Sequence, residues 1–373
     1  MLRAIFIGCL IVVAAVVLLA LGASYYVYRQ YQSVFEIPAQ LEEPSVLVGE
    51  GLLSSEEVFS DPSIGWIYEI TKVDFDQDGA EDMVLVGSSG AAILNESLEV
   101  QQKVLYEEPI SSQAKVTLTD LEVDGSYEFL VRGSWDSPVK VLDAGGKERW
   151  NYTGTFGIDD AAAGDIDGDG DREVVVGMNG GGGVHLLDSD GSVLWTQPDG
   201  NVWQVDFVSS NSGEGLDIVH SNAAGQITIR NASGSVVLQS SPGAYFSDFN
   251  KTEWFGLEGD DQLLLAEDDK IWVFDLGGKV LATWDAPLAG TLGEVAGVLI
   301  QFTGQEAKHF ACLVNFSSWG RSILYLFDAD GKLLYQEVLA QPSHAIMEKD
   351  GDLLVGCGAA VRRYRLEDGP NGG

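Results

Sequence analysis

VDFDQDGAEDMVLVG at 73–87, TDLEVDGSYEFLVRG at 119–133 and GDIDGDGDREVVVG at 164–177 share one pattern that recurs along the chain. In each of them an acidic turn precedes an apolar run that ends in Gly. Their first aspartates, Asp74, Asp120 and Asp165, are 46 and 45 residues apart. Weaker copies follow at Asp206 and Asp248, with steps of 41 and 42. A period of this length indicates a repeat architecture.

A second pattern supports the same period. It consists of an aliphatic pair, Asp or Asn, a turn Gly and a run that often ends in an aromatic residue, as in VLDAGGKERW at 141–150. The pattern occurs at seven anchors: Asn95, Asp143, Asp188, Asn231, Asp275, Asp328 and, weakly, Leu366. Asp-Gly and Gly-Gly between apolar runs are strong hairpin signals. Each unit is therefore predicted to hold four short antiparallel strands.

The repeats predict an all-β fold, because no stretch beyond the N-terminal leader shows sustained helical periodicity. Seven such units make a seven-bladed β-propeller with four-stranded antiparallel blades, in which radial closure protects the sheet edges. The last unit lacks a fourth strand, and a strand-like run, SVLVGEGLL at 45–53, precedes the first full unit. We expect 45–53 to complete the last blade, so that the propeller spans 45–369 and 370–373 form a tail.

The N-terminus predicts a membrane anchor. The segment 4–23 has no charged residue, and about twenty apolar residues in a helix span about 30 Å, the thickness of a hydrocarbon core. The apolar core of a cleaved signal peptide is shorter, about 7 to 15 residues. We expect an uncleaved transmembrane signal anchor at 1–23 and a stalk at 24–44. A cleaved leader, and hence a secreted protein, is the alternative.

Charge places the rest of the chain outside the cytoplasm and limits its partners. The sequence has 21 Lys and Arg against 57 Asp and Glu, a net charge of −36. Arg3 precedes the apolar segment, which favours an extracytoplasmic propeller, at the cell surface or in the periplasm. Such an acidic chain repels phosphate backbones, so a nucleic-acid partner is excluded and cations are favoured. An acidic surface kept for solubility is the alternative explanation.

The acidic loops predict three calcium sites. Positions one, three, five and nine of each loop carry carboxylates, position six is Gly, and position seven offers its backbone carbonyl. Calcium takes about six to eight oxygen ligands, whereas magnesium prefers a stiff octahedral shell and retains its waters. The expected ligands are Asp74, Asp76, Asp78, Ala80 and Asp82; Asp120, Glu122, Asp124, Ser126 and Glu128; and Asp165, Asp167, Asp169, Asp171 and Glu173. Empty Asp/Gly turns that only end strands are the alternative.

These loop sequences resemble a known family of repeats. DFDQDGAEDMVLVG and DIDGDGDREVVVG are similar to FG-GAP and VCBS-type repeats, the calcium-loop blades of integrin α-chain propellers and many bacterial surface proteins. The resemblance covers nearly all of 45–369, closely over the three loops. It implies that each loop joins the first and second strands of a blade and binds calcium, in a protein with an adhesion or scaffold role.

The Asp-xx-Gly-Lys-xx-Trp element is similar to repeats of quinoprotein-like propellers. That similarity implies the fold and little chemistry. Trp150, Trp195 and Trp284 are predicted to pack between blades rather than to hold a cofactor. Three cysteines are too few for a disulfide scaffold, and Cys312 and Cys357 are predicted to be buried thiols, with a bridge between them as the alternative.

The sequence shows no motif of an active site. It has no zinc-type histidine spacing, nucleophile elbow, P-loop or dinucleotide fingerprint. We therefore expect a binding or scaffold module for a protein or glycan. The alternative is a propeller enzyme, either a polysaccharide hydrolase or lyase or a quinoprotein-like oxidoreductase. A central channel lined by paired carboxylates, or by a quinone between tryptophans, would favour the enzyme.

Overall fold

The structure, a computed structural model, describes residues 41–108, 110, 115–133, 135–210, 215–267, 270–285, 294–316 and 320–367. The chain divides into two compact units, Met1–Glu42 and Glu43–Gly373. The expected anchor at 1–23, nearly all of the stalk and the tail at 370–373 lie outside the described residues. In the described part of the chain, no helix is long and apolar enough to cross a membrane.

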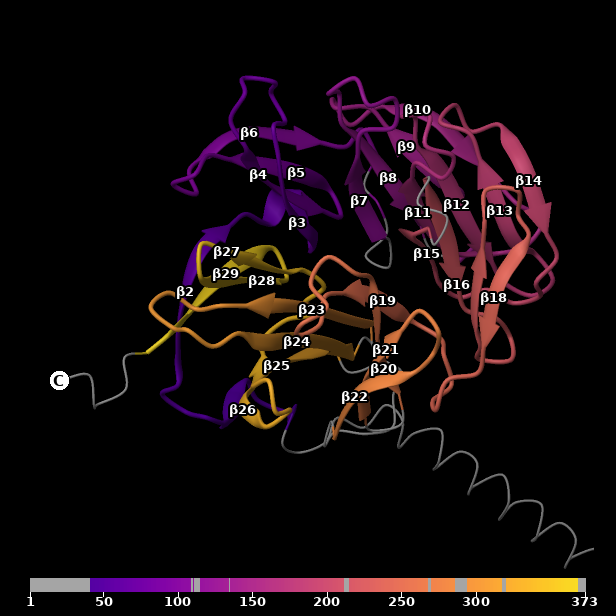
Figure 1. Cartoon of the computed structure of the whole chain (residues 1–373). Coiled ribbons are helices and arrows are strands. Elements are labelled where there is room, and N and C mark those ends of the chain that lie inside the picture. The colour runs from indigo at the N-terminus through magenta and orange to yellow at the C-terminus, as the bar shows by residue number, and fades with distance from the viewer. Residues whose placement is uncertain are drawn as a thin grey trace, which may run out of the picture. The chain divides into compact units, whose positions relative to one another are not determined.

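The second unit is an all-β, seven-bladed propeller, as predicted. Its seven antiparallel sheets are arranged around a common axis (Figure 1). Neighbouring first strands, such as β3 and β7, contact each other, so the first strand of each blade lies near the axis. The only other regular element that is described is a short 3₁₀ helix, η2 (Pro62–Ile64).

The strands of the first four blades follow the chain in order. They are β3 (Ile67–Val73), β4 (Asp82–Gly87), β5 (Gly90–Leu94) and β6 (Val100–Leu105); β7 (Lys115–Thr119), β8 (Glu128–Arg132), β9 (Val139–Leu142) and β10 (Glu148–Tyr152); β11 (Ile158–Gly164), β12 (Glu173–Met178), β13 (Gly183–Leu187) and β14 (Val193–Gln197); and β15 (Val205–Ser209), β16 (Leu216–His220), β17 (Ile227–Arg230) and β18 (Val236–Ser240).

The last three blades include the two N-terminal strands. The fifth has β19 (Phe249–Thr252), β20 (Gln262–Glu267), β21 (Lys270–Asp275) and β22 (Val280–Asp285); the sixth has β23 (Glu294–Ile300), β24 (His309–Phe316), β25 (Arg321–Phe327), β26 (Leu333–Leu339) and β1 (Ser45–Val48); the seventh has β27 (Ile346–Lys349), β28 (Asp352–Cys357), β29 (Ala360–Leu366) and β2 (Leu53–Ser60).

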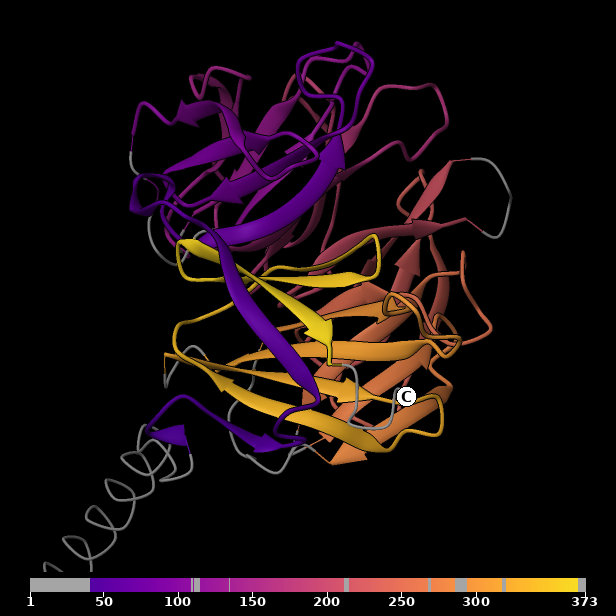
Figure 2. The same cartoon turned by 90° about the vertical axis from the view of Figure 1, so that its left-hand side faces the viewer.

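Ring closure differs in detail from the sequence prediction. The strand that completes the seventh blade is β2, which pairs antiparallel with β29 from Leu53 to Ser60 (Figure 2). The expected strand 45–53 does not complete that blade, because its first residues form β1, which pairs with β26 of the sixth blade. Gly49 and Gly51 have positive φ values of 73° and 79°, which bend the run between the two strands. The segment at 53–60, LSSEEVFS, was missed because it is too polar to show strand alternation.

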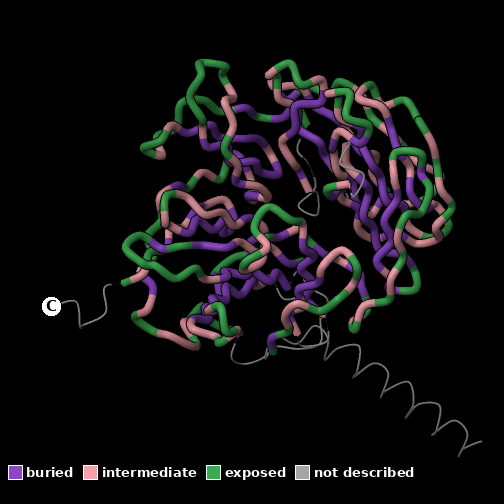
Figure 3. Tube along the Cα trace, in the orientation of Figure 1, coloured by how far each residue is buried: buried purple, intermediate pink, exposed green. Residues whose placement is uncertain are grey.

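Apolar contacts between blades hold the ring together. In one such cluster, Leu313 and Tyr335 of the sixth blade pack with Val355 and Tyr364 of the seventh. The second and third strands of each blade are buried along most of their length, whereas the innermost strands mix buried with partly exposed positions and most outer strands carry exposed ones (Figure 3). Burial is therefore deepest in the middle of each blade, where neighbouring blades pack face to face.

Tryptophans on the outer strands link one blade to the next, as predicted. The indole N–H of Trp150 donates to the Ser189 carbonyl at 2.9 Å, and that of Trp195 donates to the Ala232 carbonyl at 2.9 Å. Trp284 stacks on Phe327 of the sixth blade with ring centroids 4.2 Å apart. Each of these tryptophans therefore packs on the Asp-xx-Gly or Asn-xx-Gly turn of the following blade.

Both cysteines of the described propeller, Cys312 and Cys357, are free and buried. Burial raises the pKa of the Cys312 thiol, so the thiolate form is disfavoured. The prediction of small buried hydrophobic groups is confirmed for both.

A buried ion cluster links the third and fourth blades. Asp199, in the turn after β14, lies 3.0 Å from His220 Nε2 and accepts a hydrogen bond of 3.0 Å from Arg230 Nε. Burial opposes the charge of Asp199, but the hydrogen bonds and charges of His220 and Arg230 lower its pKa from 3.8 to about 2. The cluster therefore favours the ionised carboxylate in the folded state.

Substituting Gly191 tests the contact between turn and tryptophan. Gly191 has a φ of 85°, and a Cβ there would lie 2.9 Å from the Trp150 ring. Gly256 is a matched control, with a φ of 71° and no described heavy atom within 4 Å of such a Cβ. Both Gly→Ala changes should cost about 1–2 kcal/mol for the left-handed backbone, and G191A about 1–3 kcal/mol more for overpacking. Equal losses in chemical denaturation would contradict this interface.

The Asp199 cluster predicts a loss of stability in acid. Because folding lowers the pKa of Asp199, its ionised carboxylate stabilises the fold at pH values above its ordinary pKa of 3.8. This stabilisation is lost as the pH falls through the folded-state pKa of about 2. Asp199→Asn should therefore cost about 2 kcal/mol at pH 6, and this difference from the native chain should shrink between about pH 4 and pH 2. Urea denaturation of both chains across this range is the measurement. A difference that does not change with pH would show that the Asp199 charge is not stabilising.

Candidate functional site

The three acidic loops lie where the sequence predicted, between the first and second strands of the first three blades. They connect β3 to β4, β7 to β8 and β11 to β12. They also contact one another across the blades, because Gln77 Nε2 donates to the Gly125 carbonyl at 2.7 Å and Arg172 N donates to the Leu121 carbonyl at 2.7 Å. The loops therefore form a continuous row at one end of the propeller.

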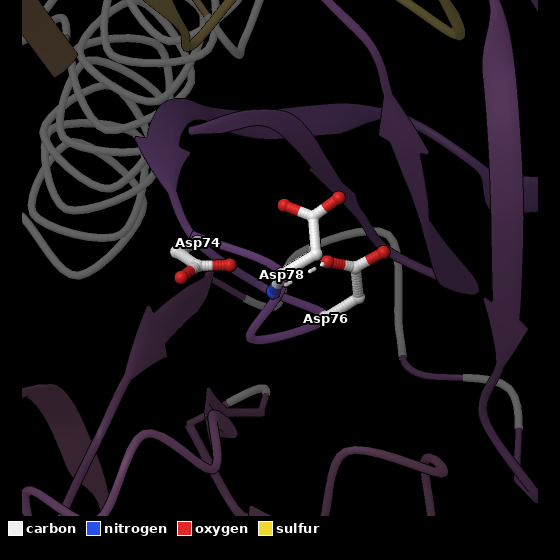
Figure 4. A group of neighbouring side chains, drawn as sticks. All are labelled: Asp74, Asp76 and Asp78. Atoms are coloured by element: carbon white, nitrogen blue, oxygen red, sulfur yellow. Dashed lines mark hydrogen bonds between the residues drawn. The ribbon is translucent and has the colours of Figure 1, made fainter. Parts of the chain in front are cut away.

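The first loop gathers carboxylates around a tight turn. Oxygen atoms of Asp74, Asp76 and Asp78 all lie within 4.8 Å of one another (Figure 4). Gly79 N donates to Asp74 Oδ2 at 3.0 Å, and the positive φ of Gly79, 90°, permits the turn. Asp74 Oδ1 is buried and has no hydrogen-bond partner among the residues described. This orphaned oxygen and its two neighbouring carboxylates fit a hard cation.

The remaining predicted ligands of the first loop lie beside this group. Ala80 N donates to Asp78 Oδ1 at 2.8 Å, which sets the turn at position seven. Asp82 Oδ2 accepts from Phe75 N at 3.2 Å and closes the base of the loop. Burial, together with the charges of Asp76 and Asp78, raises the pKa of Asp82.

The third loop gathers a deeper group. Oxygen atoms of Asp165, Asp167 and Glu173 lie within 4.8 Å of one another, and Glu173 is only 4% exposed. Gly168 N and Gly170 N donate to Asp165 at 2.7 and 3.2 Å. Burial and the charges of Asp167 and Asp169 raise the pKa of Glu173 to about 7. The carboxylates of this loop therefore repel one another, and the hydrogen bonds from backbone N–H groups do not fully offset that repulsion and the cost of burial.

The other two predicted ligands of the third loop shape its turn. Asp169 Oδ1 accepts a hydrogen bond of 3.0 Å from Asp171 N. This contact repeats the one between Asp78 and Ala80 in the first loop. The first and third loops therefore share one backbone plan.

The second loop holds a guanidinium group. Arg149, on the outer strand β10, contacts both carboxylate oxygens of Glu122, and its Nη1 donates to Glu128 Oε1 at 2.7 Å. Glu128 is 3% exposed. The Arg149 side chain also lowers the pKa of Glu122 through its hydrogen bond and charge. A positive charge from the chain itself thus lies between two of the expected ligands.

The two aspartates of the second loop accept hydrogen bonds from backbone N–H groups. Asp120 accepts hydrogen bonds from Asp124 N at 3.1 Å and Gly125 N at 2.9 Å, and Ser126 N donates to Asp124 Oδ1 at 2.7 Å. In the described chain, the groups of carboxylates that lie close enough to share a metal ion are those of the first and third loops. Sequence spacing did not reveal this difference, because Arg149 is 21 residues beyond Glu128.

A cavity of about 470 Å³ lies at the other end of the inner strands. Its lining includes Tyr68 at the start of β3 and Glu294 at the start of β23. The acidic loops follow the other ends of the inner strands, so the two sites lie apart. The sequence did not identify this site, because its residues come from blades far apart in the chain. Two carboxylates, Asp248 and Glu294, line it, which is a feature that the enzyme alternative requires.

Comparisons with known proteins show the fold and no family. No family model matches the chain, and no curated protein matches its sequence. The solved structure of BBS1N in complex with ARL6DN is similar, with a TM-score of 0.54, 14% identity, and coverage of 85% of this chain and 98% of that one. At this identity the likeness supports the propeller alone.

A second similar structure is that of a lyase. A catalytically inactive variant of virginiamycin B lyase from Staphylococcus aureus, solved with quinupristin, has a TM-score of 0.55 and 14% identity. It covers 84% of this chain and 100% of its own. Proteins with different activities therefore share this fold, and the FG-GAP resemblance stays a prediction.

Replacing Arg149 tests its role in the second loop. Arg149→Met leaves Glu122 and the buried Glu128 without their countercharge, and we expect a loss of about 1–3 kcal/mol, measured by denaturation in the presence of a chelator. Arg365→Met is the control, because Arg365 forms exposed ion pairs with Glu56 and Asp352 that contribute about 0–1 kcal/mol. Equal effects would show that Arg149 forms only a surface ion pair.

Proposed function

We propose that this chain is a calcium-stabilised propeller that binds two calcium ions, in the first and third acidic loops. The observation that carries the proposal is the clustering of Asp74, Asp76 and Asp78, and of Asp165, Asp167 and Glu173, each within 4.8 Å. The orphaned Asp74 Oδ1 supports it. The sequence predicted three ions, and we propose two, because Arg149 already pairs with Glu122 and Glu128 of the second loop.

Calcium in these loops would stabilise contacts between blades. The first loop donates through Gln77 to the second loop, and the third loop donates through Arg172 N to the second loop. Ordering the two outer loops of the row therefore also positions the middle one. An ion that binds only the folded chain stabilises it by about 2.7 kcal/mol per site at a hundredfold excess over its Kd.

We further propose that the propeller is a binding or scaffold module for a protein or glycan, tethered outside the cytoplasm by the apolar segment 4–23. The apolar length of that segment and the net charge of −36 support the placement. The similar BBS1N structure is a complex with another protein, which supports a protein partner. Capture of a partner by the full chain that depends on calcium, as a chelator would show, tests this part.

Calcium titration of the full chain tests the metal sites. Isothermal titration calorimetry should give two ions per chain, and calcium should raise the melting temperature above that of the chelated protein. Asp74→Asn with Asp76→Asn, or Asp165→Asn with Asp167→Asn, should each remove one ion. Asp190→Asn is the control, because Asp190 caps an exposed turn through Ser192 N in the same blade as the third loop.

Three outcomes would contradict the proposal in different ways. Identical melting curves with and without calcium would exclude stabilising sites in the loops. Three ions per native chain would show that Arg149 yields to a metal. Loss of an ion in the Asp190 control would indicate a general effect of surface charge.

A further inference from the structure

The cavity at the start of the inner strands is lined by charged groups of both signs, and one group of each sign has hydrogen-bonding capacity left over. It lies about 20 Å from the acidic loops, because an inner strand such as Ile67–Val73 rises about 3.3 Å per residue. The second blade supplies Lys115 and Arg132 to its wall, and the fifth and sixth blades supply Asp248 and Glu294. The aromatic side chains of Trp66 and Tyr68 complete one side.

The cationic side has too few acceptors. Lys115 Nζ and Arg132 Nε lie 3.3 and 3.6 Å from the same oxygen, Oδ1 of the buried Asp160. Asp160 Oδ2 is already used by Val205 N, which donates at 3.2 Å. Arg132 Nε is buried and has no hydrogen-bond partner among the described residues. Arg132 Nε therefore has an ion pair with Asp160 but no hydrogen-bond acceptor among the described residues, so this buried donor is available to a ligand.

The anionic side has too few donors. Glu294 is paired, because its Oε2 lies 2.7 Å from His344 Nδ1 and accepts from Asn315 at 3.4 Å. Asp248 makes no hydrogen bond or ion pair with any part of the chain that the structure describes. Its carboxylate therefore lines the cavity without a partner.

The field around Asp248 favours an incoming cation. Burial, then the charges of Glu294 and Asp160, raise the pKa of Asp248 to about 6, against the opposing charge of Arg132. Burial also disfavours the charge of Glu294, but His344 and Arg132 lower its pKa to about 2. Both carboxylates are therefore mostly ionised at neutral pH.

The unpartnered Asp248 carboxylate and the free Arg132 donor select the chemistry of a ligand. A simple anion would be repelled by Asp248 and Glu294, and a simple cation would leave Arg132 Nε without a hydrogen-bond acceptor. A neutral sugar would give neither group a partner of opposite charge in a partly desolvated site. A molecule with an ammonium group and a carboxylate satisfies both, and Arg132 binds carboxylates well through its planar group of donors.

We propose that this cavity binds a small zwitterion of the α-amino acid class, whose carboxylate contacts Arg132 and whose ammonium contacts Asp248. Trp66 and Tyr68 form the apolar part of the wall, and the Tyr68 ring is held against His344 with centroids 4.7 Å apart. A volume of about 470 Å³ is in the usual range for small-molecule sites. This site is separate from the calcium loops and does not depend on them.

Binding of free amino acids to the calcium-loaded full chain tests the proposal. Each standard amino acid is screened at millimolar concentration by thermal shift, and the best one is titrated by calorimetry. It is then compared with its decarboxylated amine and its deaminated acid, which keep the side chain and lack one charge each. Both analogues should bind about tenfold to a hundredfold more weakly.

Variants locate the site. Asp248→Asn should weaken binding of the amino acid at least about tenfold and leave binding of the deaminated acid unchanged or stronger. This variant should fold, because Asp248 has no partner in the described chain to lose. Arg132→Gln should instead weaken binding of the deaminated acid. Asp285→Asn, at an exposed ion pair with Lys270, is the control and should bind like the native chain.

Several outcomes would overturn the proposal. No thermal shift with any amino acid, or equal binding of the amine analogue, would do so. Binding or cleavage of a neutral oligosaccharide at this cavity, lost in Asp248→Asn, would favour the polysaccharide enzyme instead. If Arg132→Gln does not fold, the analogue series and Asp248→Asn still decide the question.

Discussion

The pairing of β2 with β29 closes the propeller and fixes the positions of all seven blades. It joins residues about three hundred positions apart, Leu53 to Leu366 and Ser60 to Ala360, and so closes the seven sheets into a ring. An open array would leave the first and last blades with an exposed apolar face. Closure also brings the inner strands together at the axis, which creates the cavity between blades that are distant in the chain.

The cavity and the acidic loops lie at opposite ends of the inner strands. Most inner strands begin beside the cavity, and in the first three blades they end at the acidic loops. The loops are local structures, since each forms within about ten residues of one blade. The cavity is collective, because its lining comes from the starts of several blades. A change in one loop therefore alters one site, whereas a change in ring geometry alters the whole cavity.

The second loop shows how similar local sequences acquire different chemistry. Its turn is built like the others, with Gly125 N donating to Asp120 Oδ2 at 2.9 Å as Gly79 N donates to Asp74. What differs is Arg149, which reaches Glu128 from the outer strand of the same blade. A guanidinium and a divalent ion both neutralise carboxylates, so Arg149 offsets negative charge in this loop that the first and third loops leave without a cationic partner from the described chain. The repeat pattern alone showed no reason to separate it from its neighbours.

The number of blades, the positions of the acidic turns and the packing role of Trp150, Trp195 and Trp284 could all be predicted from the sequence. These are local properties, because turn glycines, alternating apolar runs and outer-strand aromatics act within one repeat or between consecutive repeats. Three features could be seen only in the folded chain: β2 rather than 45–53 closes the ring, Arg149 pairs with carboxylates of the second loop, and Arg132 and Asp248 line one cavity without pairing. Those facts depend on residues brought together from distant blades or strands, and no local pattern records such distances.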